Sequence, residues 1–560
     1  MKIVLAQQNY HIGNFELNTK KIITAIQEAK AAGADLILFS EMCVCGYPAR
    51  DFVEFNNFIT QCEASVDRIR QEADTIGVLI GGPSRNPSKL GKDLFNAAFF
   101  LYEQKIVAEI HKTLLPTYDV FDEYRYFEPS ADWKVVPFKG KKLAITICED
   151  IWNLGDNPLY TICPMDRLME QQPDIMLNLS ASPFDYTHDE DRKAVIKANV
   201  LKYRLPLFYC NAVGSQTEIV FDGASLVFDA QANLCAALPM FTEASALLEL
   251  SDDGTIQAPI LEPASRMPDK ELNPAKLEPE LNIDQVYQAL ILGIRDYFTK
   301  MGFTKAILGS SGGIDSAVTL AIACEALGAE NVQAILLPSP YSTEHSVADA
   351  IALSTHLQNP YDVVPIHQVY NAMLQTVQPL FGDLPFSLAE ENMQSRSRGN
   401  LLMAIANKFG YILLNTSNKS ELATGYGTLY GDMAGGLSVL GDCYKLQVYA
   451  LARYINRDKE IIPRNIIEKA PSAELRPGQK DSDSLPDYAL LDQILYQYIE
   501  KRNGPEEIKQ MGFDPALVNR TLKMVNTNEY KRNQFCPIIR ISPKAFGVGR
   551  RVPIVGKYLS

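Results

Sequence analysis

Gly309-Ser310-Ser311-Gly312-Gly313-Ile314-Asp315-Ser316 is the stretch that decides the fold of the second half of this chain. It lies between a short apolar run, Ala306 to Leu308, and an apolar-periodic segment that begins near Ala317, so it predicts a strand, a glycine turn and the start of a helix. Glycines let the backbone approach a ligand closely, and the free amides of a helix N-terminus donate to phosphate oxygens. We therefore expect an anion here, although no Walker-type lysine follows and Asp315 occupies the first helical turn instead.

The sequence on both sides of this stretch alternates strand and helix signals. A helix is predicted near residues 283–300, and further strands over residues 333–337 and 411–415 alternate with helices, as in a doubly wound parallel sheet. The first half also alternates amphipathic segments with short apolar runs, which lie at residues 3–6, 36–39, 78–81, 97–102, 143–147, 175–179, 207–210 and 224–228. The whole chain is therefore predicted to be α/β.

A proline-rich segment separates the two halves. Between about residues 250 and 281 the chain has no sustained apolar period, and its prolines are Pro259, Pro263, Pro268, Pro274 and Pro279. A chain of 560 residues is too long for one ordinary core. We therefore predict one domain over residues 1–255, a linker over 256–281 and a second domain over 282–560, without an obvious repeat between them.

Composition and charge narrow the class of protein. The chain is 47% apolar and 21% charged, as globular proteins are, and its formal charge of −14 argues against nonspecific binding to nucleic acid. No apolar run has the length of a signal peptide core or a transmembrane helix, so we expect no membrane association and a cytoplasmic location. The ten cysteines form no Cys-x-x-Cys pair, which in a reducing compartment indicates buried thiols and leaves one of them available as a nucleophile.

Three motifs in the first domain each follow a predicted strand, where α/β proteins collect functional groups. They centre on Glu41, Lys112 and Cys148. A thiol needs a base to become a strong nucleophile, and a cation stabilises the oxyanion that forms when the thiol attacks a carbonyl. These three residues supply those groups, although each alone would be read as a solvated acid, a surface cation and a small core residue.

In this order and context the three residues resemble the Glu-Lys-Cys triad of the nitrilase, or carbon–nitrogen hydrolase, superfamily, which implies an α-β-β-α sandwich for the first domain. The segments at residues 118–127 and 178–184 narrow the resemblance to the glutaminase domain of the glutamine-dependent NAD synthetase family. There Glu123 matches a supporting acid, and Tyr118 and Ser182 match contacts to glutamine. His188 stands where the family often carries Lys or Arg, so a glutamine contact and an exposed histidine both stay open for it.

The glycine stretch resembles the pyrophosphate loop of the ATP-pyrophosphatases, which implies an adenine nucleotide alpha hydrolase-like fold for the second domain. Further motifs resemble those of NAD synthetases in the same order, and residues 471–488 resemble the mobile segment that closes over the site in that family. By position in these motifs, ATP is expected to contact Gly309, Ser310, Ser311, Gly312, Gly313, Ile314, Asp315, Ser316, Thr416 and Lys445. Deamido-NAD is expected to contact Asn392, Arg396, Glu421 and Lys531, and Mg²⁺ to be held by Asp315 and Glu421.

The paired resemblance implies a carbon–nitrogen ligase that hydrolyses L-glutamine and uses the ammonia to amidate adenylated deamido-NAD, releasing AMP and pyrophosphate. It implies small-molecule substrates only, with glutamine or free ammonia as nitrogen donor, ATP as co-substrate and Mg²⁺ as cofactor. It also implies a homo-oligomer, either a dimer or an octamer. Two alternatives stay open: a glutamine-dependent ATP-pyrophosphatase ligase that amidates another carboxylate, and a nucleotide-binding sensor that has lost turnover.

Overall fold

The computed structural model describes residues 1–88, 90–155, 158–257 and 276–559. The chain divides into two compact units, Met1–Lys270 and Glu271–Ser560. Most of the predicted linker over residues 256–281 lies outside the described residues, so its predicted bounds and those of the two domains stay predictions. Each unit builds its own sheets and its own core.

The first unit contains two large sheets and a small hairpin. The seven-stranded sheet has the order β15-β14-β1-β2-β3-β4-β5, with bounds Ile256–Gln257, Ala244–Leu250, Lys2–Gln7, Leu36–Leu38, Gly77–Arg85, Leu94–Tyr102 and Lys105–His111. The six-stranded sheet has the order β13-β12-β9-β8-β7-β6, with bounds Leu234–Ala237, Leu226–Phe228, Leu207–Asn211, Ile175–Ser180, Lys141–Ile147 and Val136–Phe138. The hairpin pairs β10, Val213–Gln216, with β11, Ile219–Asp222.

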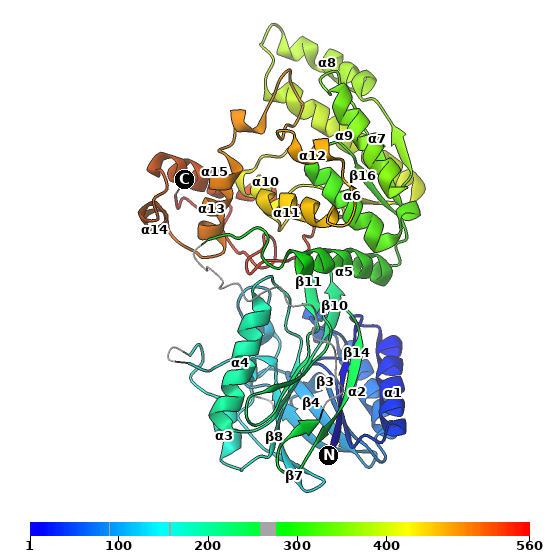
Figure 1. Cartoon of the computed structure of the whole chain (residues 1–560), viewed down its shortest axis with the longest axis vertical. Coiled ribbons are helices and arrows are strands. Elements are labelled where there is room, and N and C mark those ends of the chain that lie inside the picture. Colours follow the sequence, from blue (N-terminus) through cyan, green and yellow to red (C-terminus); the bar gives the residue numbers. More distant parts are fainter. Residues whose placement is uncertain (89, 156–157, 258–275, 560) are drawn as a thin grey trace. The chain divides into compact units, whose positions relative to one another are not determined.

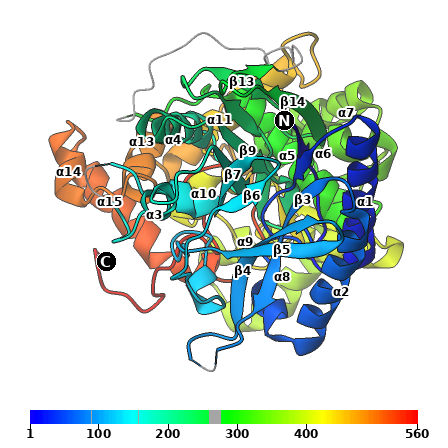
Figure 2. The same cartoon turned by 90° about the horizontal axis from the view of Figure 1, so that it is seen from below.

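Helices cover the outer face of each large sheet. Figures 1 and 2 show α1 (Phe15–Ala31) and α2 (Asn56–Glu72) beside strands of the first sheet, and α3 (Pro164–Met169) and α4 (His188–Tyr203) beside strands of the second. A left-handed residue at position 204 ends α4, and the buried face of α4 includes Ile196 and Val200. The order of layers is α-β-β-α, so the predicted sandwich is confirmed.

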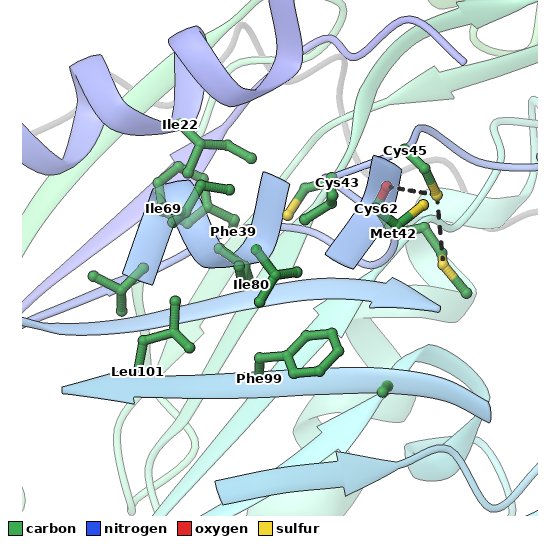
Figure 3. Close-up of a cluster of buried hydrophobic side chains, with 14 of the residues drawn as sticks. Ile22, Phe39, Met42, Cys43, Cys45, Cys62, Ile69, Ile80, Phe99 and Leu101 are labelled. Carbon is green, nitrogen blue, oxygen red and sulfur yellow. Dashed lines mark hydrogen bonds between the residues drawn. The ribbon is translucent and has the colours of Figure 1, made fainter. Parts of the chain in front are cut away.

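Residues alternate between layers along each strand because successive side chains of a strand point to opposite faces. In β1, Ile3 and Leu5 join the core between the two sheets, whereas Val4 and Ala6 face the helices. Figure 3 shows this outer core, where Ile22 of α1 and Ile69 of α2 lie against strand residues. A third core joins the six-stranded sheet to α3 and α4. The cysteine-bearing segment after β2 therefore belongs to the helix-facing layer, together with Cys62.

The second unit is built on one parallel five-stranded sheet of order β18-β17-β16-β19-β20. Its strands are Tyr361–Val363, Val332–Leu336, Ala306–Gly309, Ile412–Asn415 and Leu437–Ser438 in that order. The chain runs from β16 outward to β18, then returns to the other side of β16 at β19. The strand order therefore reverses between β16 and β19, and ligands of open α/β sheets bind at such a reversal, outside the carboxyl ends of the strands.

Helices surround this sheet and extend beyond it. They are α5 Ile283–Met301, α6 Ile314–Leu327, α7 Glu344–Leu357, α8 His367–Phe381, α9 Leu388–Phe409, α10 Lys419–Thr424, α11 Lys445–Ile455, α12 Arg464–Glu468, α13 Tyr488–Ile499, α14 Pro505–Gln510, α15 Pro515–Thr527 and α16 Glu529–Arg532. The predicted doubly wound sheet is confirmed. Among the described residues, no helix combines the length and apolar composition that crossing a bilayer requires.

Candidate active sites

Lys112 is the centre of the candidate site in the first unit. It follows β5 directly, its side chain is fully buried, and its Nζ donates to Glu41 Oε1 at 2.8 Å and to Glu123 Oε1 at 2.8 Å. Burial alone would lower the pKa of Lys112, but the charges of Glu123 and Glu41 outweigh it and hold the pKa well above its ordinary value. Lys112 therefore stays a cation inside the protein.

Glu123 shares this lysine with Glu41. Glu123 begins a single 3-10 turn, and Tyr47 donates its hydroxyl to Glu123 Oε1 at 2.8 Å. Burial raises the pKa of Glu123 to about 7, helped by the charge of Glu41 and opposed by Lys112. Near neutral pH Glu123 therefore readily takes up a proton.

Cys148 sits where β7 turns into a short 3-10 helix, Cys148–Ile151, and its φ of 45° is in the left-handed region that non-glycine residues seldom adopt. Asp150 holds this turn: one oxygen accepts from Ile147 N at 3.0 Å, and the other accepts from Thr113 N and Leu114 N at 3.0 and 2.9 Å. The turn is therefore tied to the residues that follow Lys112.

The thiol of Cys148 is buried, and burial together with the charge of Glu41 raises its pKa well above the ordinary value, against the pull of Lys112. The resting side chain is therefore a neutral thiol. Glu41, the residue predicted as its base, has an Oε2 that accepts from Ala181 N at 3.0 Å, which ties Glu41 to the segment before Ser182.

Tyr118 contacts a carboxylate that the sequence motifs did not single out. Its hydroxyl lies 3.0 Å from both oxygens of Glu149, and Tyr160 donates to Glu149 Oε1 at 3.2 Å. Burial raises the pKa of Glu149, with Lys112 and the two phenols opposing it. Its position next to Cys148 was the signal available in the sequence. The site thus contains the carboxyl group of the residue that directly follows Cys148, besides the carboxyl group of Glu41.

Ser182 and His188 lie together at the other side of the segment that holds Glu41. Ser182 Oγ is 2.9 Å from His188 Nε2, and the His188 ring stacks on Trp152 with ring centroids 5.1 Å apart. Trp152 follows the Cys148 turn directly. The structure therefore brings two of the three residues considered for glutamine, Ser182 and His188, close to the Cys148 turn, and His188 is a packed residue and not an isolated surface side chain.

The candidate site of the second unit is a cavity of about 570 Å³ at the carboxyl ends of β16 and β19. Of the residues predicted to bind ATP, it is lined by Gly309, Ser310, Ser311, Gly313, Ile314, Asp315, Ser316, Thr416 and Lys445. Ser310 is only 3% exposed, and its hydroxyl has no hydrogen-bond partner among the described residues. Ser310 thus brings an unpartnered donor to the lining of a cavity near a helix N-terminus, which suits an anionic ligand.

Gly312 is absent from that lining because it packs behind the loop. Its φ is 75°, and a Cβ at this position would lie 2.2 Å from the carbonyl oxygen of Ser346. The loop therefore contacts the first turn of α7 through bare backbone, which only glycine allows.

Three carboxylates converge near one lysine at the mouth of this loop. Lys445 Nζ donates to Asp315 Oδ2 at 2.5 Å and to Glu421 Oε1 at 3.5 Å, and Asn418 Nδ2 donates to Asp315 Oδ1 at 2.8 Å. Burial, together with the charges of Asp315 and Asp481, raises the pKa of Glu421 to about 8 against the pull of Lys445. The carboxylate oxygens that contact Lys445 here are of the kind that Mg²⁺ prefers. By themselves, the described residues form no ready cluster of metal-ligating side chains.

The segment predicted to close over the site, residues 471–488, contributes lining residues of the cavity. It is fastened by Glu474, whose Oε1 accepts from Thr343 Oγ1 at 2.8 Å and from Ser346 Oγ at 2.7 Å. Because Ser346 also packs on Gly312, the segment and the glycine loop share one contact at the start of α7.

The residues predicted to bind deamido-NAD fall into two groups. Glu421 lines the cavity. Asn392, Arg396 and Lys531 instead surround the loop after α10: Asn392 Oδ1 accepts from Thr428 Oγ1 at 2.7 Å, Arg396 donates to Leu429 O at 3.2 Å, and Lys531 Nζ donates to Gly425 O at 2.7 Å. Sequence reasoning left out Arg398, which lines the cavity and donates to Leu337 O at 3.0 Å.

The chain is similar to known proteins over its full length. Two family profiles match it: carbon-nitrogen hydrolase over residues 2–258 and NAD synthase over residues 286–535. The glutamine-dependent NAD(+) synthetase of Synechocystis sp. is 43% identical over 99% of this chain and 98% of its own length, and that of Thermotoga maritima is 39% identical over 100% and 99%. The solved structure of glutamine-dependent NAD+ synthetase from Acinetobacter baumannii in complex with ADP is 37% identical, covers 99% of this chain and 98% of its own, and gives a TM-score of 0.77.

Proposed function

The chain belongs to the glutamine-dependent NAD(+) synthetase family, a family of ligases that form a carbon–nitrogen bond with glutamine as amide donor, and on that premise we propose which of its residues perform each half of the reaction. The observation that carries the assignment is the presence, in one chain, of a closed cluster around Lys112 and Cys148 and of a cavity lined by the glycine loop. The first suits amide hydrolysis and the second suits a nucleotide.

Glutamine hydrolysis is assigned to Cys148, Glu41 and Lys112, with Glu123 as the supporting acid. Glu41 takes the proton of the Cys148 thiol as the sulfur attacks the side-chain amide carbon. Lys112, which stays cationic, stabilises the oxyanion, and the same proton is passed to the departing nitrogen as ammonia leaves. Water, deprotonated by Glu41, then releases glutamate from the thioester and restores the thiol.

Recognition of glutamine is assigned to the polar groups around the Cys148 turn. An amino acid brings an α-ammonium and an α-carboxylate, so its site needs an acid and a donor pair. Glu149, held by Tyr118 and Tyr160, is the acid, and Ser182 with His188 are the donors for the carboxylate. If His188 is neutral it donates one hydrogen bond, and if protonated it adds a charge.

The synthetase half is assigned to the cavity of the second unit, with ATP and deamido-NAD as substrates. Pyrophosphate would leave into the amides and hydroxyls of residues 309–316, beside Lys445 and Thr416. The nicotinate carboxylate attacks the α-phosphate and ammonia then displaces AMP from the mixed anhydride. Mg²⁺, held by Asp315 and Glu421, would neutralise charge on the phosphate oxygens. Among the chain's own groups, Lys445 carries the cationic charge nearest these acids.

Deamido-NAD is assigned to Asn392, Arg396, Glu421 and Lys531, and the loop over residues 425–429 that three of them contact would follow the dinucleotide. We further propose a cytoplasmic homo-oligomer, a dimer or an octamer, because ammonia must reach the anhydride without mixing with bulk water. Sedimentation at micromolar concentration tests the assembly, and a species of 62.3 kDa alone would contradict it.

The function is tested with deamido-NAD, ATP and glutamine labelled with ¹⁵N in its amide. Mass spectrometry should find the label in the amide of NAD, together with equimolar AMP and pyrophosphate. Little dilution of the label by added unlabelled ammonium is expected if ammonia is passed internally. Labelled product from another carboxylic acid, with none from deamido-NAD, would instead support the alternative ligase, and the absence of pyrophosphate release would support a sensor.

A further inference from the structure

Asn96 contacts three of the four residues assigned to glutamine hydrolysis. It lies in β4, is 1% exposed, and its side-chain Nδ2 donates to Glu41 Oε1 at 2.7 Å and to Glu123 Oε2 at 3.2 Å. Its main-chain oxygen accepts from Lys112 N at 2.8 Å. One buried residue thus links the proposed base, the supporting acid and the backbone of Lys112, the cation assigned to stabilise the oxyanion.

We propose that Asn96 is a positioning residue for glutamine hydrolysis, which holds Glu41 and Glu123 in fixed places on either side of Lys112 so that Glu41 faces Cys148. This inference rests on the proposed function of the first unit. It gives Asn96 no contact with glutamine: Asn96 acts through the carboxylates.

The need for a second donor follows from the charges in the cluster. Glu41 and Glu123 face one ammonium, and two buried carboxylates repel each other. Lys112 donates to Oε1 of each, which leaves Glu123 Oε2 with Asn96 as its hydrogen-bond donor among the described residues. Without that amide, a buried carboxylate oxygen would lose its partner, and buried unsatisfied groups of this kind shift or change protonation.

The site depends on the ability of the Asn96 amide to donate hydrogen bonds, and not on the size or shape of its side chain. Both neighbours of Nδ2 are carboxylate oxygens, so the amide nitrogen must face them, and Asn96 Oδ1 has no hydrogen-bond partner among the described residues. Aspartate has the same shape but would place a third acid against the pair. Leucine has a similar size but donates nothing. These two substitutions therefore separate hydrogen bonding from packing.

The same cluster is expected to determine how glutaminase activity depends on pH. The titratable groups that act on the carboxylate pair are Lys112, Cys148, Tyr47, Glu149 and Tyr160. A neutral amide donor favours the ionised form of the pair, so its loss should move the acidic limb of glutaminase activity to higher pH. Substitution by an acid should move it further in the same direction.

The test measures glutamine hydrolysis and ammonia-driven NAD synthesis in the full chain for N96L, N96D and N96S. For N96L we expect kcat for glutamine to fall by about ten- to a hundredfold, the KM for glutamine to change by less than about threefold, and the acidic limb to move upward. N96D should lose more, and N96S, whose hydroxyl can donate, should lose less. Ammonia-driven synthesis should stay near wild type in all three.

Asn86→Ala is the matched control, because Asn86 follows β3 and, among the described residues, its side-chain amide donates to the main-chain carbonyls of Leu90 and Lys92 and to no catalytic group. It should leave both activities unchanged. If N96D does not fold, N96L and N96S decide. Wild-type kcat and an unmoved pH profile in N96L would overturn the inference, as would a loss confined to KM or an equal loss of ammonia-driven synthesis. If the wild-type chain does not hydrolyse glutamine at all, the proposed function fails instead.

Discussion

The two sites of this chain are built in opposite ways. In the first unit Lys112, Glu41 and Glu123 are each less than 5% exposed and satisfy one another's hydrogen bonds. In the second unit the glycine loop borders a cavity of about 570 Å³, and the buried hydroxyl of the lining residue Ser310 has no partner among the described residues. Acids there outnumber the nearby lysine.

This difference follows from the ligands. A glutamine side chain is small and neutral, so the groups that act on it must be charged in advance and held by the protein. ATP and its metal bring several charges of their own, so a site for them can leave donors unpaired and acids in excess until they arrive. We therefore expect activity at the first site to fall sharply when a single hydrogen-bonding or nucleophilic atom is changed, and activity at the second site to depend mainly on the charge of its residues.

The largest effect is expected from Cys148→Ser, which breaks the first site and leaves the second intact. A serine hydroxyl is a far weaker nucleophile than a thiolate, so glutamine-driven NAD synthesis should fall by about three orders of magnitude or more. Synthesis from ammonium salts should stay near wild type. The measurement is NAD formed per minute from each nitrogen donor, and equal loss of both in a folded protein would contradict two separate sites.

Asp315→Asn breaks the second site by charge alone. Removal of one acid should weaken the hold on Mg²⁺ and free Lys445, so that synthesis from either nitrogen donor falls by about a hundredfold. Glutamate release from glutamine should continue at a measurable rate. Raised Mg²⁺ should recover part of the lost synthesis. Normal ammonia-driven synthesis in this variant would show that the acid excess has no role.

Glu474→Ala tests whether the cavity needs its closing segment. The substitution removes the hydrogen bonds from Thr343 and Ser346, each of them to a charged acceptor. We expect the KM for ATP to rise by about tenfold with a smaller change in kcat. Initial rates at varied ATP provide the measurement. An unchanged KM would mean that the segment lines the cavity without contributing to nucleotide binding.

The smallest change in turnover is expected from Asp492→Asn, which sharpens the comparison by testing the support behind the second site. Asp492 is fully buried in α13, and its two oxygens accept from Ser420 Oγ at 2.5 Å and from Leu446 N at 2.9 Å, at the start of α11. Burial raises the pKa of Asp492 to about 7. The second site thus has a prearranged support although its ligand-facing side is open.

The sign of the pH effect follows from that raised value. A folded pKa of about 7 lies above the ordinary value of an unfolded aspartate, so the protonated group stabilises the fold fully at pH below about 4 and this contribution is lost as pH rises through about 7. Relative to wild type, the free energy of unfolding of the Asn variant should therefore increase by on the order of a few kcal/mol over that window. Denaturant unfolding at a series of pH values measures the difference, and a flat difference would contradict a titrating Asp492.

The sequence predicted elements that local pattern encodes. The glycine turn, the strands at β1, β7, β8 and β16, and the start of α5 were recognisable because apolar period and turn residues are local signals. The short hairpin β10–β11 was not, since each strand has only four residues and β10 carries Gly, Ser and Gln beside a single apolar side chain, too little for a local strand signal.

The site residues follow the same division. The motifs named Glu41, Lys112 and Cys148 because each stands beside a recognisable strand end. The roles of Asn96 and Asp150 could not be predicted from spacing. Both residues act through hydrogen bonds to main-chain or carboxylate atoms that are distant in the sequence. The division of the deamido-NAD residues between the cavity and the loop at residues 425–429 was equally invisible, since it depends on how α9 and α16 pack beside that loop.

The close backbone contact at Gly312 limits which substitutions can accumulate at this position during evolution. Every substitution reachable by a single base change adds at least a Cβ, which would meet the Ser346 carbonyl at 2.2 Å and sit on a backbone whose φ is 75°. Relief would require α7 to withdraw, and α7 also receives the closing segment through Thr343 and Ser346. In a mutational scan that scores the amount of folded protein, residue 312 should therefore tolerate no replacement, whereas Ser311, which is exposed, should accept several without loss of folding. The difference in tolerance between these two neighbouring residues would then be caused by the position of α7, which lies more than thirty residues further along the chain.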